Sequence, residues 1–172
     1  PVGGGFALPA DGARAIGVGG GVGMASLFLS FERLAQASVT TVVLLGTRSS
    51  DYVLCRDEIE ALGVPLRIAT DDGSEGFHGF VTELAASVLD EKPAAPHVYA
   101  CGPTPMMRAL TDVVTSRDIP TQVALENRMG CGLGVCLGCV VPVRTGEDVS
   151  YQRVCIEGPV FDARDVIWEY RV

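Results

Sequence analysis

Short apolar runs alternate with helix-length segments along the chain as far as Leu125. We expect strands at residues 13–18, 39–45, 66–70, 97–100 and 122–125, and helices at residues 23–37, 57–62, 79–90 and 104–117. Near-continuous apolar strands separated by helices are typical of a parallel sheet that is covered on both faces. Because the crossovers between parallel strands are right-handed, the pattern predicts an α/β fold with a five-stranded, parallel, Rossmann-like sheet.

The alternation ends after Glu126, where glycine and cysteine replace the helical segments. Short strands are expected at residues 140–143 and 166–168. The change predicts two units, a nucleotide-binding domain at residues 1–126 and a small cysteine-rich module at residues 127–172. The chain begins at Pro1 without a methionine, so we expect it to belong to a longer or a trimmed polypeptide.

Composition excludes several classes of protein. The net charge of −8 and the pI of about 4.7 argue against a nucleic-acid partner, which requires clustered Lys and Arg. No apolar run approaches the roughly 20 residues of a membrane span, and no secretory signal opens the chain. Six cysteines in 172 residues do not make a small disulfide scaffold. We therefore expect a soluble, cytoplasmic protein.

A glycine-rich turn follows the first expected strand and opens the first expected helix. Its candidate phosphate-binding residues are Gly19, Gly20, Gly21 and Gly23. Glycines permit a tight turn and a close backbone approach, and a helix N-terminus supplies oriented N–H groups for a pyrophosphate. The spacing departs from the strict G-x-G-x-x-G, so a tight turn without a ligand is the alternative.

Two further loops are expected at the same sheet edge, because ligands bind beyond the carboxyl ends of parallel strands. In the loop after the second strand, Arg48 would suit a 2′-phosphate and Asp51 a ribose hydroxyl, so the sequence leaves NAD and NADP both open. After the fourth strand come Cys101 and Gly102, followed by a helix. A small buried cysteine is the alternative interpretation of Cys101.

Four cysteines, Cys131, Cys136, Cys139 and Cys155, have the spacing C-x4-C-x2-C followed by fifteen residues and a fourth Cys. This is the spacing of plant-type 2Fe–2S ferredoxins. Structural zinc is the alternative, although such sites usually pair two Cys-x-x-Cys knuckles and only one exists here. Cys55, His78 and His97 fall outside any ligand spacing and are expected to have no role.

Taken together, these segments resemble a family of ferredoxin-NADP reductase-like proteins with a C-terminal 2Fe–2S module. The resemblance is strongest to the electron-transfer subunits of NAD-dependent dihydroorotate dehydrogenases. It rests on the run Arg-Met-x-Cys-Gly-x-Gly-x-Cys-x-x-Cys at Arg128–Cys139, on Tyr99–Pro103 and on the Cys-x-x-Gly-Pro at Cys155–Pro159. It covers essentially the whole chain.

The resemblance implies a role for each candidate residue. Cys131, Cys136, Cys139 and Cys155 would ligate the cluster, the glycine turn would hold the dinucleotide phosphates, and Cys101 with Gly102 would lie beside the nicotinamide. It also implies FAD, and an FMN-containing catalytic subunit that oxidises dihydroorotate to orotate within a heterotetramer. No nucleic acid or membrane partner is implied.

One family feature has no counterpart in this sequence. The family carries an N-terminal β-barrel that binds FAD through an Arg-x-Tyr-Ser-like motif, and neither occurs in these 172 residues. We therefore expect the FAD site to lack most of its walls. Two alternative functions remain open: a reductase subunit of a ferredoxin:NADP oxidoreductase or hydrogenase complex, and a non-catalytic nucleotide-binding scaffold with a structural cluster.

Overall fold

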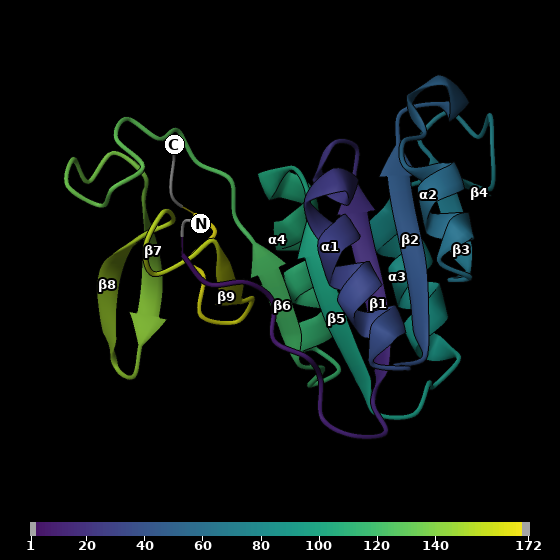
Figure 1. The fold of residues 1–172 in the computed structure, drawn as a ribbon, viewed down its shortest axis with the longest axis horizontal. Coiled ribbons are helices and arrows are strands. Elements are labelled where there is room, and N and C mark those ends of the chain that lie inside the picture. Colours follow the sequence, from purple (N-terminus) through teal and green to yellow (C-terminus); the bar gives the residue numbers. More distant parts are fainter. Residues whose placement is uncertain (1–2, 170–172) are drawn as a thin grey trace.

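The structure, a computed structural model, describes residues 3–169 and shows a layered α/β sheet with an extension beyond one edge (Figure 1). In chain order, its elements are β1 (Arg14–Gly20), α1 (Gly23–Gln36), β2 (Thr41–Thr47), the 3-10 helix η1 (Ser50–Tyr52), α2 (Arg56–Ala61), β3 (Leu66–Thr70), β4 (Phe77–His78), α3 (Val81–Asp90), β5 (Pro96–Cys101), α4 (Thr104–Thr115), β6 (Thr121–Ala124), β7 (Val140–Thr145), β8 (Asp148–Arg153) and β9 (Val160–Asp162).

Seven strands form the main sheet in the order β4-β3-β2-β1-β5-β6-β9. All neighbours in it are parallel except β9, which runs antiparallel to β6. The chain builds outward from β1 through β2 to β3, and later builds the other side with β5 and β6. The order therefore reverses between β1 and β5, where Gly19 and Cys101 are register partners at the carboxyl ends. Such a reversal is where ligands bind in open parallel sheets.

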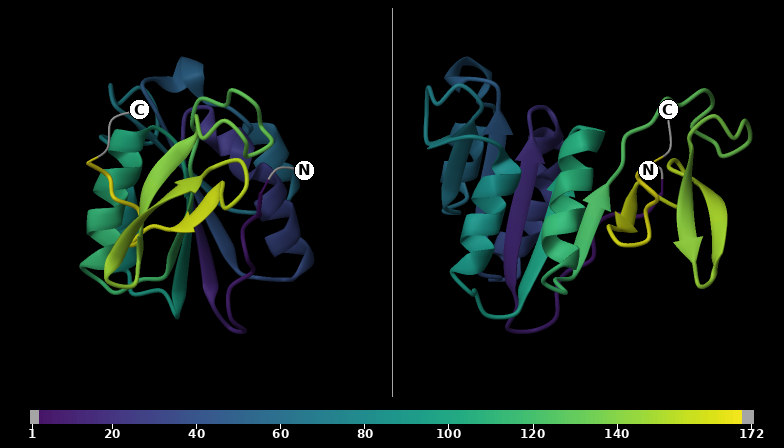
Figure 2. Two further views of the ribbon diagram at one scale, coloured as in Figure 1. Left: turned by 90° about the vertical axis from the view of Figure 1, so that its left-hand side faces the viewer. Right: turned by 180° about the vertical axis from the view of Figure 1, so that it is seen from behind.

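Successive side chains of the central strands enter two different cores, because strand residues alternate between the two faces. Ile16 and Val18 pack on the face that α3 and α4 cover. Ala15, by contrast, joins the core with Phe31 of α1 and Ile59 of α2. Figure 2 shows α3 and α4 together on one side of the sheet. Each fully buried large side chain, such as Phe31, contributes about 1.5–3 kcal/mol to this packing.

The C-terminal segment joins the sheet and extends beyond it. β9 adds to β6, and the backbone N–H of Leu125 donates to the Pro159 carbonyl at 2.8 Å. Phe161 and Trp168 belong to the same apolar core as α3 and α4. The β7–β8 hairpin and the loop that precedes β7 lie outside the β9 edge (Figure 1).

The five predicted parallel strands and the four predicted helices are all present, with shifts of a few residues at their ends. The structure adds β4, β8 and β9. The sequence did not reveal them because β4 has two exposed residues, β8 is largely exposed and polar, and β9 has only three residues. The strand expected at residues 166–168 is wrong. Only Val166 pairs there, in an isolated bridge to Val143.

Among residues 3–169, none of the helices has both the length and the apolar character that a membrane crossing demands.

Candidate functional site

The glycine turn lies at the carboxyl end of β1 and leads directly into α1. Gly21 has a φ of 52°, a conformation that favours glycine, and its N–H donates to the Gly46 carbonyl at 2.9 Å. The N-cap residue of α1 is Val22, whose apolar side chain cannot accept a hydrogen bond. No side chain therefore caps the N–H groups of the first turn. The N–H groups of Gly21, Met24 and Ala25 already donate to backbone carbonyls, so Val22 and Gly23 carry the N–H groups that the turn can offer to a phosphate at the positive end of α1.

This turn touches the one that follows β5. A Cβ added to Gly23 would lie 2.4 Å from the carbonyl oxygen of Cys101. A Cβ on Gly20 would lie 2.8 Å from Cδ of Pro103. Only residues without a side chain allow the two turns to approach this closely, so the structure brings Gly20, Gly23, Cys101 and the adjacent Gly102 to one place.

Two adjoining cavities open at this edge of the sheet, with volumes of about 440 and 500 Å³. Gly20 and Gly21 line both, and so does Arg48 from the end of β2. Asp51 lines neither, whereas Asp71 lines the smaller one. The cavities are of a size that holds small ligands, and Arg48 supplies a cation to both.

Cys101 is fully buried and faces a third cavity, of about 660 Å³, on the α1 side of the sheet. Burial raises the pKa of its thiol to about 11, and the nearby Glu126 carboxylate adds to the rise. A hydrogen bond with Ser26 acts in the opposite direction. The thiol is therefore neutral near pH 7, and Cys101 contributes a small, uncharged side chain to the wall of this cavity.

Glu126 and Ser26 are residues that sequence reasoning did not single out. Glu126 lines both the cavity beside Cys101 and the larger nucleotide-edge cavity, and Ser26 lines the first. The rule that pointed to Arg48, namely that ligands lie beyond strand ends, applies equally to Glu126, which follows β6. The position of Ser26 had no such signal, because it depends on how α1 packs on β5.

The first two cysteines of the C-terminal set lie in the loop between β6 and β7, where backbone N–H groups point at their sulfurs. The N–H of Leu133 donates to Sγ of Cys131 at 3.3 Å, and that of Gly138 donates to Sγ of Cys136 at 3.4 Å. Bonds from the Cys136 and Leu133 backbones lower the pKa of Cys131 to about 6. The loop is therefore already arranged to stabilise a thiolate, the form that ligates iron.

The other two cysteines form a buried pair. Cys139 and Cys155 are 3% and 1% exposed. Burial raises the pKa of Cys155, and Cys139 adds to the effect. The N–H of Val154 also donates to the Cys139 carbonyl at 3.1 Å, which fixes the two segments together.

The loop conformation around these sulfurs depends on small residues. A Cβ on Gly130 or Gly138 would lie only 3.3 or 3.4 Å from Sγ of Cys136. Arg153 also stabilises the loop. Its guanidinium donates to the Gly134 carbonyl at 2.9 Å and forms an ion pair with Glu157. Figure 1 shows the loop projecting from the body of the protein.

The donor set fits a 2Fe–2S cluster. Cys131 and Cys136 form one thiol pair and Cys139 and Cys155 form a second, and Cys131 is near enough to add to the raised pKa of Cys155. Two pairs offer two thiolates to each of two irons, with N–H donors for the sulfurs. Within residues 3–169, no three His, Cys, Asp or Glu side chains are placed to hold a single metal ion.

A doubly wound sheet with a glycine turn at its switch point, followed by a four-cysteine loop, defines the class of NAD-binding oxidoreductase domains that carry an iron–sulfur module. Residues 18–112 match the family described as the oxidoreductase NAD-binding domain. Residues 126–167 match the family described as the iron–sulfur cluster binding domain of dihydroorotate dehydrogenase B. The chain belongs to the oxidoreductase NAD-binding domain family, and its predicted resemblance is confirmed.

Curated relatives carry the name "Dihydroorotate dehydrogenase B (NAD(+)), electron transfer subunit". The protein of that name from Desulforamulus reducens is 40% identical over 98% of this chain, and the one from Bacillus caldolyticus is 41% identical over 97%. The chain spans only 64% and 63% of the length of these two relatives.

Solved structures agree with the fold. An NADH-dependent reduced ferredoxin-NADP oxidoreductase, described in the context of flavin-based electron bifurcation, aligns with a TM-score of 0.79 and 32% identity, over 91% of this chain and 55% of that one. The C-terminal domain of a hydrogenase from Pyrococcus furiosus aligns with a TM-score of 0.56 and 16% identity, over 72% of this chain and 98% of that one. The second likeness shows the fold alone.

Proposed function

We propose that this chain relays electrons between a flavin-containing dehydrogenase subunit and NAD, as the electron-transfer part of an NAD-dependent dihydroorotate dehydrogenase. The observation that carries the proposal is the cavity of about 660 Å³ beside Cys101. Its walls include Cys101 from the nucleotide edge and Met129 from the cysteine loop. A cofactor in this cavity would lie between the nucleotide and the cluster. The names of the curated relatives support the same function.

Within this proposal each unit of the chain has a separate task. Residues 1–126 bind NAD, with the glycine turn at the phosphates and Arg48 near the adenosine. Cys101 and Gly102 lie against the nicotinamide. Residues 127–172 hold the cluster through the four cysteines, and the N–H groups of the loop stabilise their thiolates. The cluster, when bound, supplies one-electron transfer.

The cavity beside Cys101 is our candidate for a flavin ring. Ser26, Ser30 and Arg33 of α1 supply polar groups on one wall, and Leu29 and Phe6 supply apolar surface. This is the mixture that small-molecule sites show. We propose that FAD completes its site with a β-barrel of the kind that the family carries.

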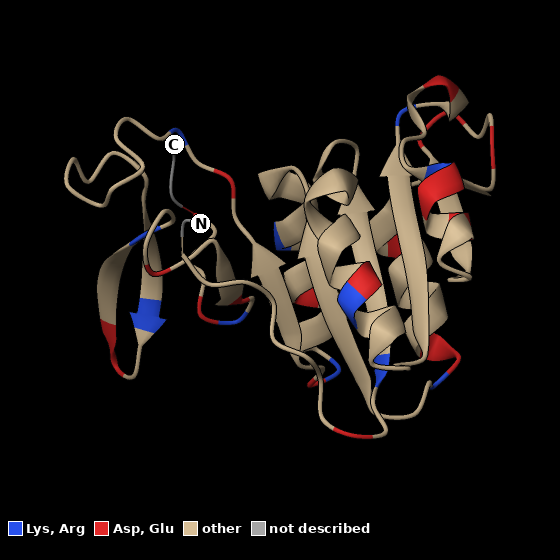
Figure 3. Cartoon of the chain, viewed as in Figure 1, with Lys and Arg blue, Asp and Glu red and all other residues tan. Residues whose placement is uncertain are grey.

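The tip of the cysteine loop is our candidate surface for the FMN-containing partner. Leu133 is 76% exposed and Val135 is 80% exposed, and Leu137 beside them is exposed as well. Residues 129–139 contain no charged side chain, as Figure 3 shows for this loop. A contiguous exposed apolar surface marks an interaction site, and contact here would bring the partner's flavin near the cluster. We propose a heterotetramer in the cytoplasm, where thiolates stay reduced for iron.

The proposed function is tested by anaerobic reduction of the cluster. With the FMN-containing subunit present, dihydroorotate is expected to bleach the visible absorption of the chain's cluster, and without that subunit no bleaching is expected. Bleaching by reduced ferredoxin or by hydrogenase with hydrogen, but never by dihydroorotate, would instead establish a reductase subunit of the kind that the 32% identical structure represents.

Polar substitution of the loop tip is expected to weaken the partner complex while leaving the cluster intact. A minority of interface residues, clustered near the centre, each cost more than about 1 kcal/mol when truncated, and Leu133 and Val135 are our candidates for such residues because they are the most exposed apolar side chains of the loop. For Leu133→Ser combined with Val135→Ser, we therefore expect the Kd for the partner to rise by about tenfold or more. Val149→Ser is the matched control, because Val149 is 55% exposed on β8, outside the loop. An unchanged Kd, with iron content also unchanged, would show that the loop tip is not the docking surface.

A further inference from the structure

The N-terminal segment crosses the β5–β6 side of the sheet, and the backbone of Ala7 is bonded there to side chains of both strands. The side-chain amide of Gln122 in β6 makes two hydrogen bonds to the backbone of Ala7. The Ala7 N–H donates to Oε1 at 2.9 Å, and Nε2–H donates to the Ala7 carbonyl at 3.1 Å. The Tyr99 hydroxyl donates to the same carbonyl at 3.0 Å. We call residues 5–8 the N-terminal strap.

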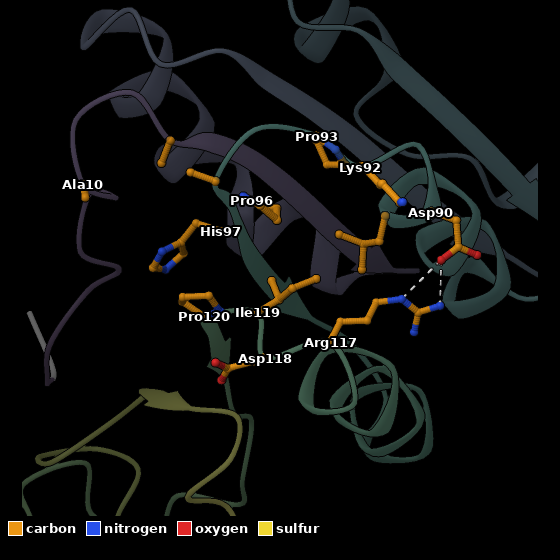
Figure 4. A pocket seen from close by; sticks show the side chains of 13 residues that line it. Ala10, Asp90, Lys92, Pro93, Pro96, His97, Arg117, Asp118, Ile119 and Pro120 are labelled. Carbon is orange, nitrogen blue, oxygen red and sulfur yellow. Dashed lines mark hydrogen bonds and ion pairs between the residues drawn. The ribbon is translucent and has the colours of Figure 1, made fainter.

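The same amide nitrogen of Gln122 lies 2.9 Å from Nε2 of His97. Since an amide nitrogen can only donate, Nε2 of His97 must accept, and the imidazole must be neutral with its proton on Nδ1. The His97 ring is also stacked on Tyr99, with centroids 4.9 Å apart. It lines a cavity of about 830 Å³ at the amino ends of the strands (Figure 4), through which protons reach it.

Protonation of His97 breaks this arrangement for a geometric reason. A proton on Nε2 would point at the hydrogens of the Gln122 amide nitrogen. If the amide rotated to offer Oε1 to His97, its nitrogen would face the Ala7 N–H and its oxygen would face the Ala7 carbonyl. Both Gln122–Ala7 hydrogen bonds would then become repulsive, so a charged His97 leaves the Ala7 carbonyl with the Tyr99 hydroxyl as its remaining hydrogen-bond donor and weakens the attachment of the strap.

The charged groups around His97 only partly oppose this effect. Asp162 of β9, the register partner of Gln122, is the acidic group that favours the charged imidazole, but it is paired with Arg164. From the cavity side, Arg117 pairs with Asp90, and Asp118 pairs with Arg164. Burial outweighs the attraction of Asp162 and lowers the pKa of His97.

We propose that His97 is a proton sensor that holds the N-terminal strap closed when neutral and loosens it when protonated. The strap matters because Gly5 and Phe6 form part of the wall of the cavity beside Cys101. Arg33 donates to the Phe6 carbonyl within the strap, and the N–H of Gly4, just before the strap, donates to the Gly158 carbonyl; neither bond titrates near neutral pH. Loosening is therefore centred on Ala7, next to Phe6 in the cavity wall, while the bonds at Gly4 and Phe6 keep the segment on the sheet.

The direction of the pH dependence follows from the lowered pKa. The released imidazole titrates near about 6.5 and the strapped one below that value. The strap is therefore fully closed above about pH 6.5, and it weakens as the pH falls from there through the lower pKa of the strapped state. Below that lower pKa, no further weakening is expected.

The test is amide hydrogen exchange of Ala7 by NMR from about pH 5 to about pH 8, expressed as a protection factor. We expect the Ala7 protection factor to fall by up to about tenfold per pH unit below pH 6.5. The N–H of Val43, which donates to the Pro65 carbonyl far from the strap, should keep its protection. A parallel fall at Val43 would mean general acid unfolding and would overturn the proposal, as would constant protection of Ala7.

Two variants separate the sensor from a merely structural contact. His97→Phe keeps an aromatic ring on Tyr99 but cannot titrate, so the Ala7 protection factor should become independent of pH. Gln122→Glu keeps an acceptor for the Ala7 N–H, but its second oxygen faces both the Ala7 carbonyl and His97. Protection of Ala7 should therefore be lower than in the native chain near pH 8, and it should rise rather than fall as the pH decreases and His97 becomes charged. If His97→Phe retained the pH dependence of the native chain, another group would be the sensor.

Discussion

Cys131→Ser is expected to leave the chain folded but almost without iron. Cys131 lies in an exposed loop outside both apolar cores, so its replacement removes no core packing. A serine hydroxyl does not ionise near neutral pH and is a poor ligand for iron. Changes to groups that only support a metal ligand already cost about 10–100-fold in affinity, so loss of a ligand should cost more. We expect iron and acid-labile sulfide to fall from about two of each per chain to near zero.

The matched control is Cys55→Ser. Cys55 is also a free thiol, but it lies at the start of α2, far along the chain from the cysteine loop. Its replacement should leave iron, sulfide and visible absorption unchanged. Thermal unfolding of the apo forms should be similar for both variants. Full iron content in Cys131→Ser, or stoichiometric zinc in the native chain, would contradict the assignment of the cluster.

Cys139 and Cys155 would be poorer choices for this test, and the reason lies in their surroundings. Both are buried in the core that β7 and α4 share, so a serine there would bury a hydroxyl as well as remove a ligand. Burying a hydroxyl that lacks a partner costs about 1–3 kcal/mol by itself. Loss of iron would then be inseparable from loss of folding.

The sequence predicted those parts of the fold that depend on periodicity. The apolar runs of β1, β2 and β5 are buried on both faces, which makes them recognisable without any knowledge of their neighbours. β9 could not be found this way, because its three residues become a strand only by pairing with β6. The strand expected around Val166 failed for the opposite reason. An apolar sequence is present, but it is buried against β7 through a single bridge.

The candidate site divides in the same manner. Spacing alone grouped the four cysteines, because ligands that share one cluster are constrained along the chain. Spacing did not predict that Cys131 and Cys136 are exposed or half-exposed while the other two are buried. His97 was expected to have no role, and its contact with Gln122 depends on the alignment of β5 with β6, in which Tyr99 and Gln122 are register partners. Such contacts across strands leave no local signal in the sequence.

Gly23→Ala is expected to abolish or strongly weaken NADH binding while leaving the cluster in place. The new Cβ would lie 2.4 Å from the Cys101 oxygen and 2.7 Å from the Gly102 nitrogen, and these backbone atoms cannot move aside as a side chain would. Helix propensity works the other way, since alanine inside a helix is better than glycine by about 1 kcal/mol. The steric clash of the new methyl group costs about 1–3 kcal/mol, which exceeds that gain. The clash pushes apart the two turns that line the nucleotide cavities. We therefore expect the Kd for NADH, measured by fluorescence titration, to rise by about tenfold or more.

Gly17→Ala provides the control for destabilisation of β1 alone. A Cβ there would lie 2.3 Å from Cε1 of Phe31, so it also overpacks the protein, but it meets a side chain in the interior of the α1 core. Its thermal stability should fall, while its Kd for NADH should stay near that of the native chain at a temperature where both are folded. The added methyl group of Gly17→Ala meets a core side chain, whereas that of Gly23→Ala meets the backbone of the turn after β5. Only Gly23→Ala should therefore separate the turn after β1 from the turn after β5. An unchanged Kd in Gly23→Ala would mean that the dinucleotide does not bind where these two turns touch.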